Sequence, residues 1–172
     1  MSSLVSHWSI PVAELLRHPG SKREVDLAGD LGAVAVTASH VRPGAETQVV
    51  GTIEALDNIT VQFKGTVTAP WDGECRRCLG PASGDLTVQV HELFERAPES
   101  EDIYPLQADR LDLEPLARDA LFLELPQAPL CMADCQGLCP DCGADRNTVD
   151  CGHAVDELDP RWDALRELGE QN

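Results

Sequence analysis

Basic residues are scarce in this sequence. It has 13 Lys and Arg against 30 Asp and Glu among 172 residues, which gives a formal net charge of -17. A protein that binds nucleic acid through its phosphates needs clustered Lys and Arg side chains to displace counterions. The composition therefore argues against a general nucleic-acid-binding protein.

Long hydrophobic runs are also missing. No stretch approaches the roughly 18 consecutive apolar residues of a membrane-spanning helix, and the first ten residues lack the charged and apolar regions of a signal peptide. The hydrophobic content is nevertheless 42%, which favours a folded chain over a solvated acidic tail. We therefore expect a cytoplasmic protein that does not interact with membranes.

Catalytic motifs are the third absence. The sequence has no nucleophile elbow, glycine-rich phosphate loop, zinc-protease helix motif or paired-carboxylate arrangement. Its five histidines are scattered along the chain. We therefore predict that the protein is not an enzyme.

Acidic charge is concentrated in the C-terminal half. Residues 1–96 carry 12 acidic and 8 basic side chains, whereas residues 97–172 carry 18 and 5. The two halves therefore have net charges of -4 and -13. This division separates a nearly balanced half from a strongly acidic one.

The clearest periodicity predicts a β-hairpin. Apolar and polar residues alternate from Ile59 to Trp71, and residues 85–95 repeat the pattern, which is typical of strands with one buried face. The turn that contains Cys75 and Cys78 would lie at the tip of this hairpin. Two further strands are expected in residues 34–53.

Helix signals flank this β-rich region. Ser9 and Pro11 favour a short helix that ends at Pro19-Gly20, and Asp112 is the predicted N-cap of a helix that ends before Pro126. Residues 96–109 have the composition of a surface loop or linker, and a third helix is predicted to start at Asp159 and end before Gly169. The predicted fold class is α+β, with an antiparallel sheet or partly closed barrel, flanking helices and a C-terminal cysteine-rich zinc-binding segment.

This pattern predicts two domains. Residues 1–126 form a β-rich core domain with an N-terminal helix and a closing helix at residues 112–125. Residues 127–172 form a cysteine-rich zinc segment followed by the C-terminal helix. The cysteine-rich segment has too few large apolar residues to build its own core.

Seven cysteines are present, two at Cys75 and Cys78 and five between Cys131 and Cys151. Reduced cytosolic thiols in an odd number do not suggest a disulfide framework. The segment from Cys139 to Gly143 has the form of a zinc knuckle, in which two thiolates separated by two residues hold one tetrahedral ion. We therefore predict structural Zn²⁺, and favour it over an iron–sulfur cluster because no redox partner domain is evident.

Two ligand sets are compatible with these spacings. The favoured set is Cys131, Cys135, Cys139 and Cys142, because neighbouring ligands close the shortest loops. The alternative is a zinc ribbon, in which Cys75 and Cys78 join Cys139 and Cys142. Two other residues are possible substitute ligands: Cys151 and His153.

Five segments resemble a known family. They are Leu15–Ser21, Glu74–Leu79, Leu125–Pro126, Cys135–Asp145 and Asp159–Trp162. Together and in this order they resemble the YceD family, the large ribosomal RNA subunit accumulation proteins of bacteria and plastids, in its high-GC Gram-positive form.

The resemblance implies a role in the synthesis, processing or stability of 23S ribosomal RNA and in assembly of the large subunit. It implies no catalytic residues. Some family members have the first cysteine turn without the C-terminal cysteines, which favours the local ligand set, whereas Cys151 departs from many relatives and leaves the fourth ligand open.

The charge distribution suggests how such a role would be performed. Residues 97–172 would repel RNA, so we expect a basic ribosomal protein or an assembly intermediate of the large subunit as the partner. Ribosomal RNA would be engaged indirectly or through the N-terminal half, with Arg76 and Arg77, placed near Lys64, as possible contacts. The alternatives are a zinc-thiol redox sensor and a metal-braced structural adaptor.

Overall fold

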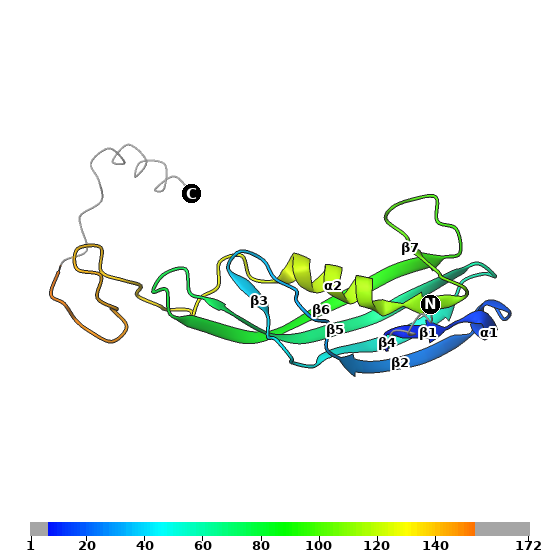
Figure 1. Ribbon diagram of the computed structural model, residues 1–172, viewed down its shortest axis with the longest axis horizontal. Coiled ribbons are helices and arrows are strands. Elements are labelled where there is room, and N and C mark those ends of the chain that lie inside the picture. Colours follow the sequence, from blue (N-terminus) through cyan, green and yellow to red (C-terminus); the bar gives the residue numbers. More distant parts are fainter. Residues whose placement is uncertain (1–6, 154–172) are drawn as a thin grey trace, which may run out of the picture.

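The computed structural model describes residues 7–153 (Figure 1). The elements in chain order are β1 (Ser9–Pro11), α1 (Ala13–Leu16), β2 (Lys22–Gly29), β3 (Ser39–Val41), β4 (Thr47–Ala55), β5 (Thr60–Glu74), β6 (Pro81–Glu95), β7 (Tyr104–Pro105), β8 (Arg110–Asp112) and α2 (Leu113–Glu124). The helix predicted from Asp159 lies outside the described residues.

The long hairpin predicted from the alternating pattern is confirmed. Strands β5 and β6 pair antiparallel along their full lengths, from Thr60 opposite Glu95 to Glu74 opposite Pro81. On the covered face Val61, Phe63 and Val67 are fully buried. The turn at residues 75–80 forms the tip.

The sheet is open rather than closed into a barrel. Its strand order is β2-β4-β5-β6-β7, with β3 paired to β5, and its pairs are antiparallel except for the short β6–β7 pair. The predicted antiparallel α+β fold is thus confirmed. The partly closed barrel is not formed by the described strands, because β2 and β7 lie at opposite edges.

Helix α2 covers one face of the sheet and runs along the hairpin toward its tip (Figure 1). The Asp112 side chain caps it by accepting a hydrogen bond from the Glu114 N–H at 3.1 Å, as the sequence predicted. The helix ends at Glu124, two residues before Pro126. Its buried residues join the main core, and each fully buried leucine contributes about 2 kcal/mol. They are Leu113, Leu116, Ala117 and Leu121.

The start of the chain differs from the prediction. Residues Ser9–Pro11 form strand β1, which pairs with β8, and only Ala13–Leu16 are helical. The Arg110 guanidinium holds this strand by donating hydrogen bonds to the hydroxyl and carbonyl oxygens of Ser9, at 2.8 and 2.6 Å. Pairing with a distant strand therefore replaces the predicted N-terminal cap.

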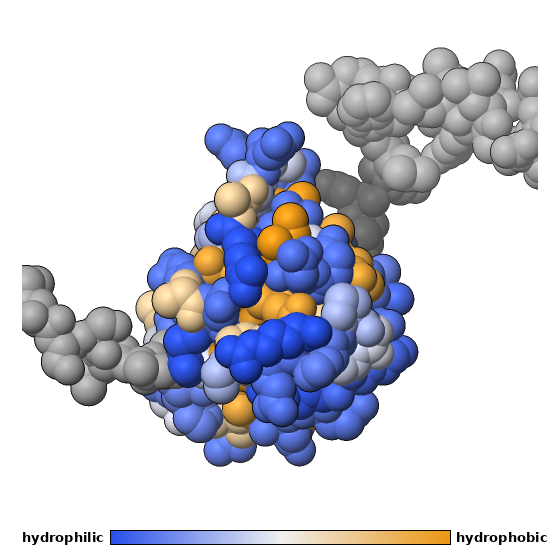
Figure 2. Space-filling model, turned by 90° about the vertical axis from the view of Figure 1, so that its right-hand side faces the viewer, coloured by the Kyte–Doolittle hydropathy of each residue, from blue (hydrophilic) through white to orange (hydrophobic). Residues whose placement is uncertain are grey.

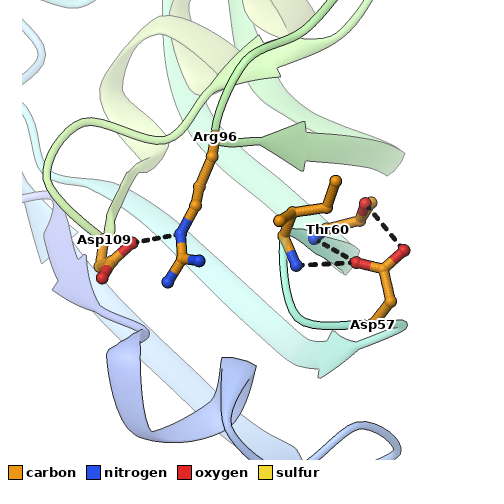
Figure 3. A network of polar contacts seen from close by, with 5 residues as sticks. Asp57, Thr60, Arg96 and Asp109 are labelled. Carbon is orange, nitrogen blue, oxygen red and sulfur yellow. Dashed lines mark hydrogen bonds and ion pairs between the residues drawn. The ribbon is translucent and has the colours of Figure 1, made fainter.

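Residues 96–109 form a loop that returns to the sheet. Strand β7 adds to the sheet beside β6, and Leu106 is buried. At the two ends of this loop, Arg96 Nε donates to Asp109 Oδ1 at 2.6 Å (Figure 3). In the neighbouring β4–β5 turn, the Asp57 carboxylate accepts hydrogen bonds from the backbone N–H groups of Ile59 and Thr60, at 2.8 and 2.7 Å.

Two glycines face each other where β4 and β5 pair. A Cβ atom built on Gly51 would lie only 2.7 Å from the Gly65 Cα and 2.8 Å from Phe63 Cζ. Any side chain there would displace the buried Phe63 ring or separate the strands. The glycine pair thus allows the Phe63 ring to lie against the backbone.

Figure 2 views the end of the molecule that lies farthest from the cysteine-rich segment. Its surface is largely hydrophilic, with small hydrophobic areas between polar side chains. The exposed apolar residues of the chain include Leu56 and Ile59 in the β4–β5 turn. Within residues 7–153, no helix has the length and apolar character needed to span a membrane.

Candidate metal centres

The hairpin tip forms a tight cysteine turn, which we call knuckle 1 (residues 75–80). The Cys75 N–H donates to the Gly80 carbonyl at 2.8 Å, and the Leu79 N–H donates to the Cys75 carbonyl at 2.9 Å. Leu79 adopts the left-handed conformation with φ of 59°. This turn directs the backbone N–H groups around the Cys75 sulfur.

A second turn, knuckle 2 (residues 139–144), repeats this hydrogen-bond pattern. The Cys139 N–H donates to the Ala144 carbonyl at 2.8 Å, and the Gly143 N–H donates to the Cys139 carbonyl at 2.9 Å. Here Gly143 occupies the left-handed position, with φ of 72°, which glycine adopts without steric cost. The two knuckles have the same backbone design at different places in the fold.

The first knuckle belongs to a group of four thiols, cluster 1, formed by Cys75, Cys78, Cys131 and Cys135. Cys75 and Cys135 are buried, and the other two are half-buried. The Cys75 and Cys135 sulfurs lie 3.8 Å apart, and those of Cys78 and Cys131 lie 3.6 Å apart. Cluster 1 therefore joins the hairpin tip to the segment that follows α2.

The second knuckle belongs to cluster 2, formed by Cys139, Cys142, Cys151 and His153. Cys139 is buried, Cys151 is half-buried, and Cys142 and His153 are exposed. The Cys139 Sγ lies 3.7 Å from His153 Nδ1. All four ligands of cluster 2 come from one short stretch of chain.

Both groups have the dimensions of a tetrahedral metal site. Within each cluster the ligand atoms all lie within 4.8 Å of one another. Four sulfurs at about 2.3 Å from a tetrahedral ion would be about 3.8 Å apart, which agrees with the shortest contacts in cluster 1. The two clusters are therefore two groups of residues that could each hold a metal ion.

Hydrogen bonds to sulfur adjust the acidity of the thiols. Backbone N–H groups, chiefly that of Cys78, lower the pKa of the Cys75 thiol to about 6. The His153 N–H likewise lowers the pKa of Cys151 to about 6. Burial, together with the adjacent thiols, raises the pKa of Cys131 to about 12. The surroundings thus lower the pKa of some thiols and raise the pKa of others, and a bound cation would favour the thiolate form of its ligands.

Two residues outside the predicted ligand sets hold cluster 1 in place. The Asn147 side-chain amide donates to the Cys135 sulfur at 3.3 Å, and its Oδ1 accepts from the Gln136 N–H at 2.7 Å. The Arg77 guanidinium donates to the Cys135 carbonyl at 2.8 Å. Asn147 carries no sequence signal beyond its position between two ligands of cluster 2.

The close approach of the two segments also requires a glycine. The Leu138 N–H donates to the Arg77 carbonyl at 3.1 Å. Gly137 has φ of 72°, and a Cβ atom there would lie 3.0 Å from the same carbonyl oxygen. Gly137 therefore lets the cysteine-rich segment pass directly over the hairpin tip.

The structure divides the favoured ligand set between the two clusters. Cys131 and Cys135 lie in cluster 1, whereas Cys139 and Cys142 lie in cluster 2. The local set predicted from short loops is thus not one group in the structure, because α2 carries the chain back to the hairpin tip and brings Cys131 and Cys135 there.

The ribbon set is divided as well. Its two knuckles occupy different clusters, so Cys75 and Cys78 do not share a group with Cys139 and Cys142. Cys151 and His153, named as substitute ligands, complete cluster 2. The number of candidate ligands was the signal in the sequence that could have predicted two sites. Seven cysteines and His153 make eight candidate ligands, which is enough for two sets of four.

Comparison with known proteins identifies relatives of the whole chain. An uncharacterized protein of Mycobacterium leprae is 40% identical over 173 residues, which cover 96% of this chain and 79% of the relative. An uncharacterized protein of Mycobacterium tuberculosis is 33% identical over 173 residues, covering 96% and 83%. These mycobacterial relatives agree with the high-GC Gram-positive form suggested by the sequence.

A plant protein carries a functional name. The chloroplastic large ribosomal RNA subunit accumulation protein YCED homolog 1 of Arabidopsis thaliana is 31% identical over 68 residues, which cover 40% of this chain and 21% of the relative. No solved structure matches the chain. Residues 63–169 match the family model described as large ribosomal RNA subunit accumulation protein YceD. The chain therefore belongs to the YceD family.

Proposed function

We propose that this protein is a non-catalytic factor that supports the synthesis, processing or stability of 23S ribosomal RNA, and thereby assembly of the large ribosomal subunit. The family is named for large ribosomal RNA subunit accumulation. The observation that carries the proposal is cluster 1, which fastens the acidic, cysteine-rich segment to the hairpin tip. The protein thus presents an acidic surface on a fixed scaffold.

Zinc is the ion that suits both clusters in this proposal. Four thiolates, or three thiolates and one imidazole, are ligand sets of structural zinc sites, and zinc imposes no geometry beyond the tetrahedron that these groups form. Four ligands close a site and leave no open position for a substrate. The same observation supports a non-enzymatic role, because the most reactive side chains of the chain are grouped as ligands.

The charge of the C-terminal half supports a basic protein as the partner. Described residues 97–153 carry 12 acidic and 3 basic side chains. Four thiolates around one Zn²⁺ add a further net charge of -2. Such a surface attracts a basic ribosomal protein and repels RNA, so complementary charge would speed the encounter with the protein.

A surface cavity of about 460 Å³ offers a place for this contact. Its lining combines four carboxylates with three apolar or aromatic side chains: Glu92, Glu101, Asp102, Asp119, Tyr104, Phe122 and Leu123. The Tyr104 hydroxyl donates to Asp119 at 2.9 Å. Burial, then the hydrogen bond to Asp119 and the charges of Asp119 and Glu92, raise the pKa of Tyr104. The four carboxylates of the lining give the cavity its negative charge.

Contact with RNA would come from the hairpin tip in this proposal. Both arginines are exposed, and the Arg77 guanidinium already donates one hydrogen bond to the Cys135 carbonyl. Lys64 is not near them, because it pairs with His91 and lies 11 residues before Cys75, about 35 Å along the strand. Arg76 is therefore the better candidate of the two for a phosphate contact.

A pull-down from low-salt lysate tests the partner. The double variant Glu101→Lys, Asp102→Lys should recover about fivefold less basic ribosomal protein than the unaltered chain, because it reverses charge at the cavity. The matched control is Glu14→Lys, Glu46→Lys, which makes the same charge change elsewhere and should lose less. Recovery of ribosomal RNA without any basic protein would contradict the proposed partner.

The effect on ribosomal RNA is tested in a strain that lacks the gene. Deletion should lower the ratio of 23S to 16S ribosomal RNA, and expression of the unaltered chain should restore it. Cys75→Ser should fail to restore it, because that variant releases the acidic segment from the hairpin tip. An unchanged ratio after deletion would contradict the proposed function.

The exposed Cys142 supports a zinc-thiol redox sensor as a second candidate. Hydrogen peroxide would accept two electrons from a pair of cluster 2 thiolates and two protons from solvent, forming one disulfide and two water molecules while the zinc ion leaves. This candidate predicts zinc release by peroxide, reversal by a dithiol and a phenotype that depends on oxidation. Zinc retention under peroxide would exclude it.

A further inference from the structure

We propose that clusters 1 and 2 bind one zinc ion each, and that only the ion in cluster 2 exchanges readily with zinc ligands in solution. This inference rests on the zinc binding in the proposed function and goes beyond a purely structural role for the metal. It assigns different tasks to the two clusters: a permanent clamp at cluster 1 and a reversible site at cluster 2.

The two clusters are separate and complete. They share no ligand, and each contains four. In cluster 1, Cys75 and Cys135 are separated by 60 residues, and Cys78 and Cys131 by 53. In cluster 2, Cys139 and His153 are only 14 residues apart. Each group can therefore fill or empty without removing a ligand from the other.

Access to the ion differs between the clusters. In cluster 1 the Cys75 and Cys135 side chains are 0% and 2% exposed. In cluster 2 both Cys142 and His153 are exposed. Zinc accepts a fifth ligand transiently and has no preferred geometry from its d electrons. The rate of ligand exchange is therefore set mainly by how easily a competing ligand reaches the ion, which favours exchange at cluster 2.

The ligands of the two clusters also differ in how firmly they are held. Cys75 lies directly after β5, the Cys135 carbonyl accepts from Arg77, and the Cys135 sulfur accepts from Asn147. Moving these ligands requires distortion of the hairpin tip. Cys151 and His153, by contrast, follow the last described turn and contact their own cluster. One end of cluster 2 can therefore open while the sheet stays intact.

The consequence is a zinc-dependent surface. Cluster 2 encloses the segment 139–153, whose acidic residues contribute to the charge offered to a basic partner. Loading of cluster 2 would hold residues 150–153 against knuckle 2. Loss of its ion would free this end of the segment, while Asn147 still donates to the Cys135 sulfur and cluster 1 remains closed. Zinc availability would thereby change the partner surface without unfolding the protein.

Native mass spectrometry combined with alkylation tests the inference on the unaltered chain. We expect two zinc ions at the start. Excess EDTA should produce a one-zinc species that persists at least about tenfold longer than the two-zinc species. N-ethylmaleimide applied at that stage should modify Cys142 and Cys151, whereas Cys75 and Cys135 stay protected. This measurement needs no substitution and does not depend on the folding of a variant.

Two matched pairs of variants assign each ion. Cys142→Ser should retain one chelator-resistant zinc ion, and Cys131→Ser should retain only the exchangeable one. His153→Gln should speed loss of the zinc ion from cluster 2. His91→Gln, a change at an exposed histidine of β6, should leave the rates of zinc loss from both clusters unchanged.

Three results would overturn the inference: a single bound ion, two ions that leave together, or early alkylation of Cys75 and Cys135. Absence of zinc would contradict the proposed zinc role as well. Two ions that leave together would contradict only the unequal exchange, and the ribosomal RNA measurement would still decide the proposed function.

Discussion

The sulfur atoms of Cys75 and Cys135 lie 3.8 Å apart although 60 residues separate them in the chain. The Arg77 guanidinium strengthens the same junction by donating to the Cys135 carbonyl. The contact joins the far end of the β5–β6 hairpin to the segment that leaves α2. Four predictions follow from this junction and from the sheet that supports it.

Loss of cluster 1 should destabilise the whole fold more than loss of cluster 2. A zinc ion that binds only the folded chain raises the free energy of unfolding, by about 4 kcal/mol when free zinc exceeds the dissociation constant a thousandfold. Cys135→Ser should therefore lower the free energy of unfolding of the zinc-loaded protein by up to about this amount. Cys142→Ser, the control, should leave melting of the sheet nearly unchanged. Thermal unfolding followed by far-UV circular dichroism measures both, and equal melting temperatures would contradict the clamp.

Substitution of the left-handed residue should affect zinc binding differently in the two knuckles. Leu79 has φ of 59° and a largely exposed side chain, so Leu79→Gly should relieve strain of about 1 kcal/mol and preserve zinc binding at cluster 1. Gly143→Leu places a side chain where glycine now has φ of 72° and should weaken zinc binding at cluster 2. Competition titrations with a zinc-binding dye measure both. Weaker binding in Leu79→Gly would show that the Leu79 side chain has another role.

The glycine pair in β4 and β5 should not tolerate alanine. Gly51→Ala brings its Cβ within 2.8 Å of Phe63 Cζ, and overpacking of this kind costs about 1–3 kcal/mol. Chemical denaturation measures the loss. Gly20→Ala is the comparison, because its Cβ would meet nothing within 4 Å and only the positive φ is strained. A smaller effect at Gly51 than at Gly20 would mean that the strands adjust to the methyl group.

Acidification should reveal the contribution of Asp57 to the free energy of unfolding. The backbone N–H groups of Ile59 and Thr60 lower the pKa of this carboxyl below its ordinary value. The folded state then binds the proton less readily than the unfolded state, so the hydrogen bonds stabilise the fold above the ordinary pKa. This contribution is lost as the pH falls through the lowered value.

Asp57→Asn retains an acceptor oxygen but cannot titrate. Its free energy of unfolding should therefore fall less steeply than that of the unaltered chain between about pH 5 and pH 3. Urea unfolding at matched pH measures the two slopes, and release of zinc in acid affects both proteins alike. Parallel slopes would contradict the assignment to Asp57.

Local patterns were sufficient for the hairpin and for α2. The alternation from Ile59 to Trp71 predicts a strand with one buried face. The Asp112 cap, followed by apolar residues at helical spacing, predicts α2. The sequence pattern does not indicate strand β2 because it is an edge strand (Lys22–Gly29) in which only Val25 is buried. Its partner strand, rather than its own alternation, holds it in the sheet.

The ligand groups could not be deduced from spacing alone. Short loops favour neighbours in sequence, but α2 runs back along the hairpin and delivers the following segment to its tip (Figure 1). There the Arg76 N–H donates to the Pro129 carbonyl at 3.0 Å, two residues before Cys131. Tertiary structure thus groups Cys131 and Cys135 with the distant Cys75 and Cys78, although the sequence already showed that the cysteines suit a metal site.

The order of the cluster 1 ligands along the chain has a consequence for biosynthesis. A growing chain emerges N-terminus first, so Cys75 and Cys78 leave the ribosome well before Cys131, which follows Cys78 by 53 residues. The hairpin and α2 are both complete before the fourth thiol becomes available. Cluster 1 therefore becomes complete only after the whole sheet and the helix have been made, and a stalled chain would display an unclosed pair of thiols.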